Sequence, residues 1–136
     1  GLFDGQGYSK RSRPVRIAAA TDVGGGTSYS MLRTMDEAYK VVALQGEKMN
    51  PFAAFWQMTL GNAKALSLDE RIGTLDVGTD ADLVVLDAKA TPAMALRMET
   101  VKSLAEELFV LQTLGDDRAV RETYVAGRPL KRELTA

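Results

Sequence analysis

Apolar residues recur at helical spacing in residues 31–42, which predicts an amphipathic helix over this stretch. Met31, Met35, Ala38 and Val42 follow one another at intervals of three and four, so that they share one side of a helix. Gly46 is suited to the helix end. The candidates for its N-cap are Thr27, Ser28 and Ser30.

Two further helices are predicted downstream by the same criterion. Asn50 followed by Pro51 is a typical helix start, with asparagine as the cap and proline in the first helical position. We expect Gly61 and Asn62 to interrupt this helix before a last helical turn over residues 63–66. The final helix carries Val101, Leu104, Leu108 and Leu111 on one stripe and ends at Gly115.

Short runs of β-forming residues separate these helices and predict strands over residues 15–21, 72–75, 81–86 and 119–125. The run Leu83–Leu86 is continuously apolar, so we expect it to be buried. Strands and helices in this order belong to an α/β protein. The inventory fits the end of a larger α/β structure better than a complete domain, because a strand–helix unit cannot bury both faces of a parallel sheet by itself.

The composition limits the chemistry that the chain can perform. The net charge of −1 offers no basic surface for nucleic acid or for an anionic membrane, and no apolar run is long enough to span a bilayer. The chain has no cysteine, which fits a cytoplasmic protein, and no histidine. A metal site built from this chain alone would therefore have to consist of carboxylates.

Asp22 is the candidate catalytic residue. It follows the predicted strand 15–21 and precedes Gly24–Gly26, and barrel enzymes keep catalytic side chains at the carboxyl ends of their strands. Two other interpretations of this loop compete. Asp22 could simply cap the following helix, or the glycines could form a phosphate-binding loop, although the lysine of such a loop is missing and the spacing is wrong.

Other possible functional groups have simpler interpretations. Phe52, Phe55 and Trp56 could stack on a purine, but their helical spacing favours packing in the core. Asp116 and Asp117 could form a pair of acid–base carboxylates, but adjacent residues in a turn point apart. We therefore expect them to act in a turn or cap with Arg118.

Three segments resemble the guanine deaminases of the amidohydrolase superfamily. Residues 21–32, with the sequence TDVGGGTSYSML, resemble the last barrel strand and its loop. Residues 72–87, IGTLDVGTDADLVVLD, look like the return from an amidohydrolase barrel into a small β-sandwich. Residues 114–118, LGDDR, and 124–128, YVAGR, resemble the end of guanine deaminases. Together the segments occur in the family's order and span essentially the whole chain.

The resemblance implies a fold class and a division of the chain. The fold would be α/β, the C-terminal end of a TIM-like (β/α) barrel plus part of the accessory β-sandwich. Residues 1–66 would hold the last barrel strand and helices, and residues 67–136 would form the C-terminal part of the sandwich with one helix. The opening residues Gly1–Phe3 resemble the region after the seventh barrel strand, so we expect the chain to be a fragment.

The resemblance also implies an activity and a cofactor. Guanine deaminases hydrolyse guanine to xanthine and ammonia with a water activated by one zinc ion, which is held by histidines and one aspartate. Asp22 would be that aspartate, contacting the metal and accepting a proton from the water. The substrate-binding residues are not identified by the resemblance. The complete enzyme would be a cytoplasmic homodimer that binds neither nucleic acid nor membrane.

The chain departs from the family in lacking every histidine ligand. One carboxylate cannot hold zinc tightly in water, so we expect the chain alone to be inactive. Two other interpretations stay open. The parent could be another amidohydrolase, which deaminates a different heterocycle or removes chlorine from a triazine, or the chain could be a non-catalytic structural fragment.

Overall fold

The computed structural model describes residues 11–131, so the expectations for residues 1–10 lie outside the described residues. The elements are, in chain order, α2 (Met31–Leu44), α3 (Pro51–Trp56), the π-helix η1 (Gln57–Gly61), α4 (Asn62–Leu66), β1 (Leu83–Leu86), α5 (Pro92–Met98), α6 (Leu104–Leu114), the 3₁₀ turn η2 (Asp117–Ala119), β2 (Val120–Val125) and β3 (Arg128–Pro129).

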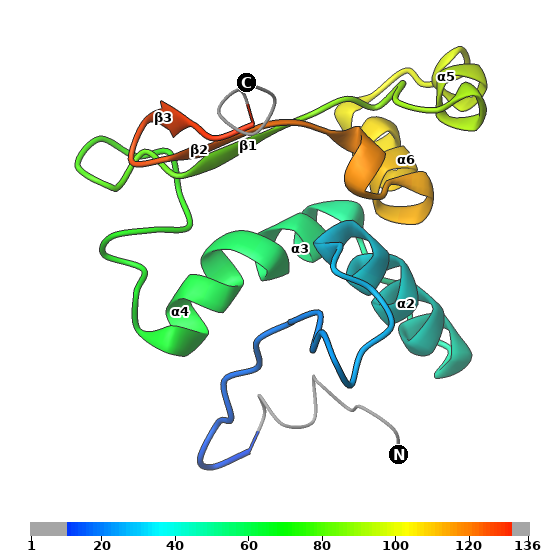
Figure 1. Ribbon diagram of the computed structural model, residues 1–136. Coiled ribbons are helices and arrows are strands. Elements are labelled where there is room, and N and C mark those ends of the chain that lie inside the picture. The colour runs from blue at the N-terminus through cyan, green and yellow to red at the C-terminus, as the bar shows by residue number, and fades with distance from the viewer. Residues whose placement is uncertain (1–10, 132–136) are drawn as a thin grey trace.

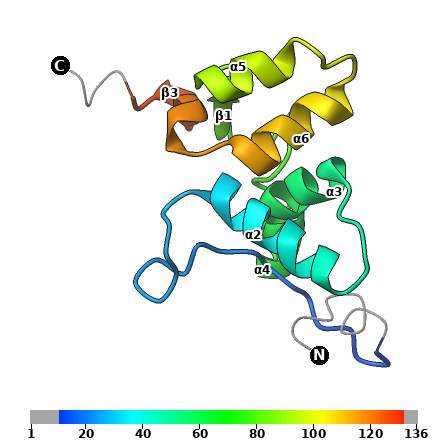
Figure 2. The same ribbon diagram turned by 90° about the vertical axis from the view of Figure 1, so that its right-hand side faces the viewer.

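These elements form two layers (Figures 1 and 2). One layer holds α2 and the continuous helical unit α3–η1–α4. The other holds the sheet together with α5 and α6. Helix α6 packs against both α2 and α3, so it joins the layers. The extended residues 11–30 run along the side of α4 and α2 that faces away from the sheet (Figure 1).

A small apolar core lies where the layers meet. Its buried residues come from both halves of the chain: Leu32, Ala88, Met94, Val110, Leu111 and Ala119. Phe55 and Met58 of the α3–η1 unit pack against this cluster, and Tyr39 meets Phe109 edge-on with ring centroids 5.4 Å apart. Two polar side chains are also buried in the described part. Asp36 pairs with Lys40 at 2.8 Å, whereas the Gln112 amide has no hydrogen-bond partner there.

Three of the helix ends predicted from the sequence are confirmed, whereas Val101, predicted on the final helix, lies before its start at Leu104. Ser30 caps α2 by accepting a hydrogen bond from the Arg33 N–H, and Asn50 caps α3 with Pro51 in the first helical position. Gly115 ends α6. Helix α5 was not predicted, although Thr91 before Pro92 is a start signal of the same kind as Asn50 before Pro51.

The expected interruption at Gly61 and Asn62 was wrong, because the helix continues through them as a π-turn. The Asn62 N–H donates to the carbonyl of Gln57, five residues back. A side chain at position 61 would collide with the Trp56 ring, since a Cβ there would lie 2.8 Å from its Cζ3 atom. Glycine is therefore needed for close packing of the helix against its own tryptophan.

The sheet is antiparallel, with strand order β1–β2–β3 and Val84 opposite Thr123. The prediction that Leu83–Leu86 is buried was wrong. Val84 and Val85 point to opposite faces, and they are 52% and 43% exposed. Leu83 and Leu86 at the ends of the strand are half-buried, and Leu86 packs against the core, so only the middle of the strand is exposed.

Residues 72–75 form a bend instead of the predicted strand. Gly73 takes a φ of +99°, and a Cβ there would lie 2.8 Å from the Ala63 Cβ and 2.9 Å from the Leu60 Cα. The chain thus turns at Gly73 and packs against the end of the helical unit, where only glycine has room.

No helix within the described residues is long and apolar enough to cross a membrane.

The two positive-φ glycines of this loop provide a matched test of that close approach. Gly78 has nearly the same conformation, φ +102°, but open space around it. Gly78→Ala should cost only backbone strain, about 1–3 kcal/mol. Gly73→Ala should cost about 1–3 kcal/mol more, because the methyl group has no room. Urea unfolding followed by Trp56 fluorescence measures both, and equal losses would contradict the packing of Gly73 on Leu60 and Ala63.

Candidate functional site

The segment that leads to Asp22 is extended, but it is not the strand predicted over residues 15–21. Within residues 11–131 no other strand pairs with it, and side chains of the helical unit take the place of a ladder. The Gln57 amide donates to the Ile17 carbonyl at 2.8 Å. The Asn62 amide both donates to the Ala19 carbonyl and accepts from the Ala19 N–H, each at 2.8 Å.

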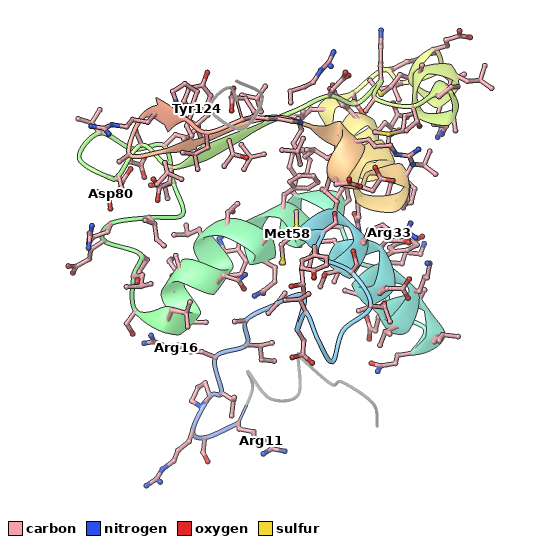
Figure 3. All side chains as sticks on the ribbon, viewed as in Figure 1. Arg11, Arg16, Arg33, Met58, Asp80 and Tyr124 are labelled. Carbon is pink, nitrogen blue, oxygen red and sulfur yellow. The ribbon has the colours of Figure 1, made fainter. Side chains whose placement is uncertain are left out.

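Arg16 adds a contact at the end of the helical unit. Its guanidinium donates to the Lys64 carbonyl at 2.8 Å and to the Ser67 hydroxyl at 3.1 Å. Figure 3 shows Arg16 beside the end of α4. The last carbonyls of a helix lack partners within the helix, and a cation there is favourable. The extended segment and the helical unit therefore hold each other through polar groups.

Asp22 begins a tight loop that folds over its own backbone. Its φ is 48°, and its carbonyl accepts hydrogen bonds from the N–H groups of Gly25, at 2.9 Å, and Gly26. A Cβ on Gly26 would lie 1.9 Å from the Thr21 carbonyl oxygen, and one on Gly25 would lie 2.8 Å from the Asp22 Oδ2 atom. The glycines are thus required so that the loop can close around Asp22.

This geometry removes the two competing interpretations of the loop. Helix α2 is capped by Ser30, so Asp22 does not cap it. The N–H groups of Gly25 and Gly26 point at the Asp22 carbonyl, so they do not form an open cradle for phosphate. What remains is an exposed carboxylate on a closed loop at the end of an anchored segment.

The residues of this chain do not complete a zinc site. No group of three or more His, Cys, Asp or Glu side chains comes together within residues 11–131, and the chain contains no histidine. Zinc in proteins is held by about four ligands, mostly nitrogen and sulfur. Asp22 can supply one oxygen ligand, and the other ligands would have to come from elsewhere.

The aromatic residues of α3 only partly follow the prediction. Phe55 packs against the core, as expected. Phe52 and Trp56 do not, since they are 49% and 48% exposed within the described structure. They lie one turn apart on α3, and Trp56 packs against Gly61 of its own helical unit instead of the core.

Asp116 and Asp117 act as a turn, as predicted, and do not form a catalytic pair. The Asp116 carboxylate accepts hydrogen bonds from the Arg118 backbone N–H, at 3.0 Å, and from its guanidinium, at 2.6–3.1 Å. The Arg118 side chain, aided by its backbone N–H, holds the pKa of Asp116 below its ordinary value, against the opposing effect of burial. Asp117 is exposed beside this turn.

The amidohydrolase family matches residues 11–130, nearly the whole of the described chain. The chain therefore belongs to the amidohydrolase family. Within it, the chain is 47% identical over 116 residues to the guanine deaminase of Escherichia coli, a match that takes in 85% of this chain and 26% of that protein.

Solved structures give the same result. The structure is similar to E. coli guanine deaminase with a TM-score of 0.83, over 86% of this chain and 27% of that one. It is similar to the guanine deaminase of Bradyrhizobium japonicum with a TM-score of 0.82 and 30% identity, over 96% of this chain and 34% of that one. An adenosine deaminase of Xanthomonas campestris with bound zinc has a TM-score of 0.57 and 26% identity, over 73% of this chain and 21% of that one.

These matches confirm the predicted resemblance and fold class, a piece of an amidohydrolase α/β barrel with adjoining strands. They also show that the chain spans about a quarter of the length of E. coli guanine deaminase. The family to which it belongs consists of hydrolases, and the relatives named here act as deaminases.

The Asp116–Arg118 pair predicts a pH dependence of stability. Because the folded-state pKa of Asp116 lies below the unfolded value, its contribution is present above the unfolded value, about pH 4, and is lost as the pH falls through the folded value. Asp116→Asn should cost about 1 kcal/mol at pH 7, since water screens the exposed guanidinium. Urea unfolding at pH 7 and pH 3 should show this difference shrinking.

Asp117→Asn is the control for that experiment. It removes a neighbouring charge and leaves the hydrogen bonds between Asp116 and Arg118 in place. We expect a smaller effect at pH 7. A loss for Asp116→Asn that is the same at both pH values would show that the ion pair does not stabilise this turn.

Proposed function

We propose that the chain is one part of a guanine deaminase, in which guanine and water are converted into xanthine and ammonia. The single observation that carries this proposal is the 47% identity to E. coli guanine deaminase across 85% of the chain. The high structural similarity to a second guanine deaminase, with a TM-score of 0.82, supports it. The more distant adenosine deaminase shares only 26% identity, so guanine is preferred as the substrate.

Asp22 is the residue of this chain that we propose to act in the reaction. The exposed carboxylate can accept the proton of the attacking water, as a general base. In this proposal it is also one ligand of a zinc ion, whose other ligands are histidines outside this chain. Such an ion, when bound, lowers the pKa of the attacking water. That a related deaminase of known structure has bound zinc supports the choice of metal.

The reaction needs only that Asp22 holds and returns one proton. The water oxygen forms a bond to the ring carbon that carries the exocyclic amine, and its proton goes to the carboxylate. The bond between that carbon and the amine then breaks. The amine takes the proton held by Asp22 and leaves as ammonia, the second proton of the water moves to the adjacent ring nitrogen, and the oxygen becomes a carbonyl of xanthine. The hydrogen bonds from Gly25 and Gly26 to the Asp22 carbonyl hold the backbone from which this carboxylate projects.

The proposal extends to the organisation of the protein. Residues 1–66 would belong to the barrel and residues 67–136 to the accessory sandwich, with α6 of the second part packed on α2 and α3 of the first. A homodimer and a cytoplasmic location are further parts of the proposal. Light scattering and cell fractionation of the complete protein measure them.

Asp22→Asn in the complete protein tests the role of this residue. It keeps the size of the side chain and removes its charge, so kcat for guanine should fall by about 10²–10⁴-fold. Ammonia release at saturating guanine measures the loss. Asp69→Asn, which changes an exposed aspartate in the turn after α4, is the matched control and should leave kcat unchanged. Turnover at the unaltered rate in Asp22→Asn would contradict the assignment.

The 136-residue chain by itself should show neither zinc bound at equimolar amounts nor release of ammonia from guanine, because it has no histidine. Metal analysis after dialysis and the same ammonia assay check this. Turnover by the chain alone would contradict the division of the site. If the complete protein acted on another heterocycle and left guanine unchanged, the assignment of the substrate would be wrong.

A further inference from the structure

Within residues 11–131, the amide side chain of Asn62 pairs with the segment that leads to Asp22 in the way that a neighbouring strand would. Its Nδ2 donates to the Ala19 carbonyl and its Oδ1 accepts from the Ala19 N–H, each at 2.8 Å. A strand partner satisfies the same two groups of a residue in a sheet. Within residues 11–131, Ala19 is the last residue before Asp22 that is hydrogen-bonded to the helical unit, so this is the anchored contact nearest to Asp22 along the chain.

The π-turn explains why Asn62 can reach this segment together with Gln57. In an α-helix, residues five apart point about 140° away from each other. The wider turn of η1 (Gln57–Gly61) brings positions 57 and 62 to the same side, and the Gln57 Nε2 lies 3.4 Å from the Asn62 Oδ1. The same Nε2 donates to the Ile17 carbonyl at 2.8 Å. The side-chain amides of Gln57 and Asn62 therefore both hydrogen-bond the extended segment, one at Ile17 and the other at Ala19.

The stability of the helix does not account for these features. Asparagine is a weaker helix former than alanine, and π-turns are rare and occur mostly at functional sites. Asn62 is only half-buried, so an apolar core does not require it. Together, the π-turn and Asn62 make the contact with the backbone of Ala19 possible.

We propose that Asn62, with Gln57 as a second contact, is a positioning residue for Asp22. Asp22, Gly25 and Gly26 form a closed loop through the hydrogen bonds to the Asp22 carbonyl, so the loop moves as one body. Residues 19–22 connect the closed loop to the helical unit, and the Asn62 amide holds Ala19 at the start of this connection. The inference rests on the proposed function, because it assigns to Asn62 an effect on turnover through Asp22.

The test compares Asn62→Ala with Asn50→Ala in the complete protein. Both changes remove an asparagine that hydrogen-bonds to backbone, but Asn50 caps α3 and does not contact residues 15–22. A purely structural role would make the two variants behave alike. Each variant is measured for the thermal midpoint, for kcat and KM with guanine, and for the hydrogen-exchange rate of the Ala19 amide.

We expect Asn62→Ala to lower kcat by about 10–100-fold, because displacing a reacting group by about 1 Å has an effect of this size. The KM for guanine should stay within about twofold, since no purine contact is removed, and the Ala19 amide should exchange at least about tenfold faster. Asn50→Ala should leave kcat and the exchange of Ala19 unchanged at a similar loss of thermal midpoint. If Asn62→Ala does not fold, Asn62→Ser, whose side chain is too short to reach both groups of Ala19, should give the same results.

The outcomes separate this inference from the proposed function. An active protein in which Asp22→Asn abolishes turnover while Asn62→Ala and Asn62→Ser keep kcat would overturn the positioning role and leave the proposed function standing. An unchanged exchange rate of the Ala19 amide would also overturn it. A complete protein that does not deaminate guanine would overturn the proposed function, and the effect on turnover assigned to Asn62 would fall with it.

Discussion

An extended backbone needs hydrogen-bond partners, and the arrangement around Asp22 depends on how that need is met. The Asn62 amide pairs with both backbone groups of Ala19, and the Gln57 amide pairs with Ile17. Arg16 adds a further contact by donating to the Lys64 carbonyl of α4 and to the Ser67 hydroxyl. These groups attach the segment to the helical unit, α6 attaches that unit to the sheet layer, and the carboxylate is thereby held in a defined place on the molecule.

Local signals predicted the helices well, and contacts between distant residues explain what they missed. Ser30, Asn50 and Gly115 act as the caps expected of them, because capping involves only neighbouring residues. The pair Gly61–Asn62 was interpreted as a break, since the packing of Trp56 on Gly61 and the bond from Asn62 to Ala19 join residues that no local pattern connects. A π-turn has no sequence signature of its own.

The predictions for the strands failed where burial or pairing depends on other parts of the protein. The apolar run Leu83–Leu86 correctly predicts a strand, but the described residues leave Val84 and Val85 exposed, and only its ends are half-buried. Residues 15–21 lack a ladder because no strand within residues 11–131 pairs with them. Likewise, the position of Asp22 after an extended segment is compatible with both a cap and a catalytic role, and only the resemblance to guanine deaminases favours the catalytic one. The missing histidines were readable from composition, and they are why this carboxylate can only be one member of a site.

The central claim is that Asp22 is a metal ligand held in place from the helical unit by Asn62. A crystal structure of the complete, zinc-loaded protein tests it most directly. We expect zinc to be coordinated by histidines and by a carboxylate oxygen of Asp22, with the Asn62 amide bonded to both backbone groups of Ala19. A zinc ion coordinated without Asp22, or an Ala19 paired to another strand with Asn62 turned away, would contradict it.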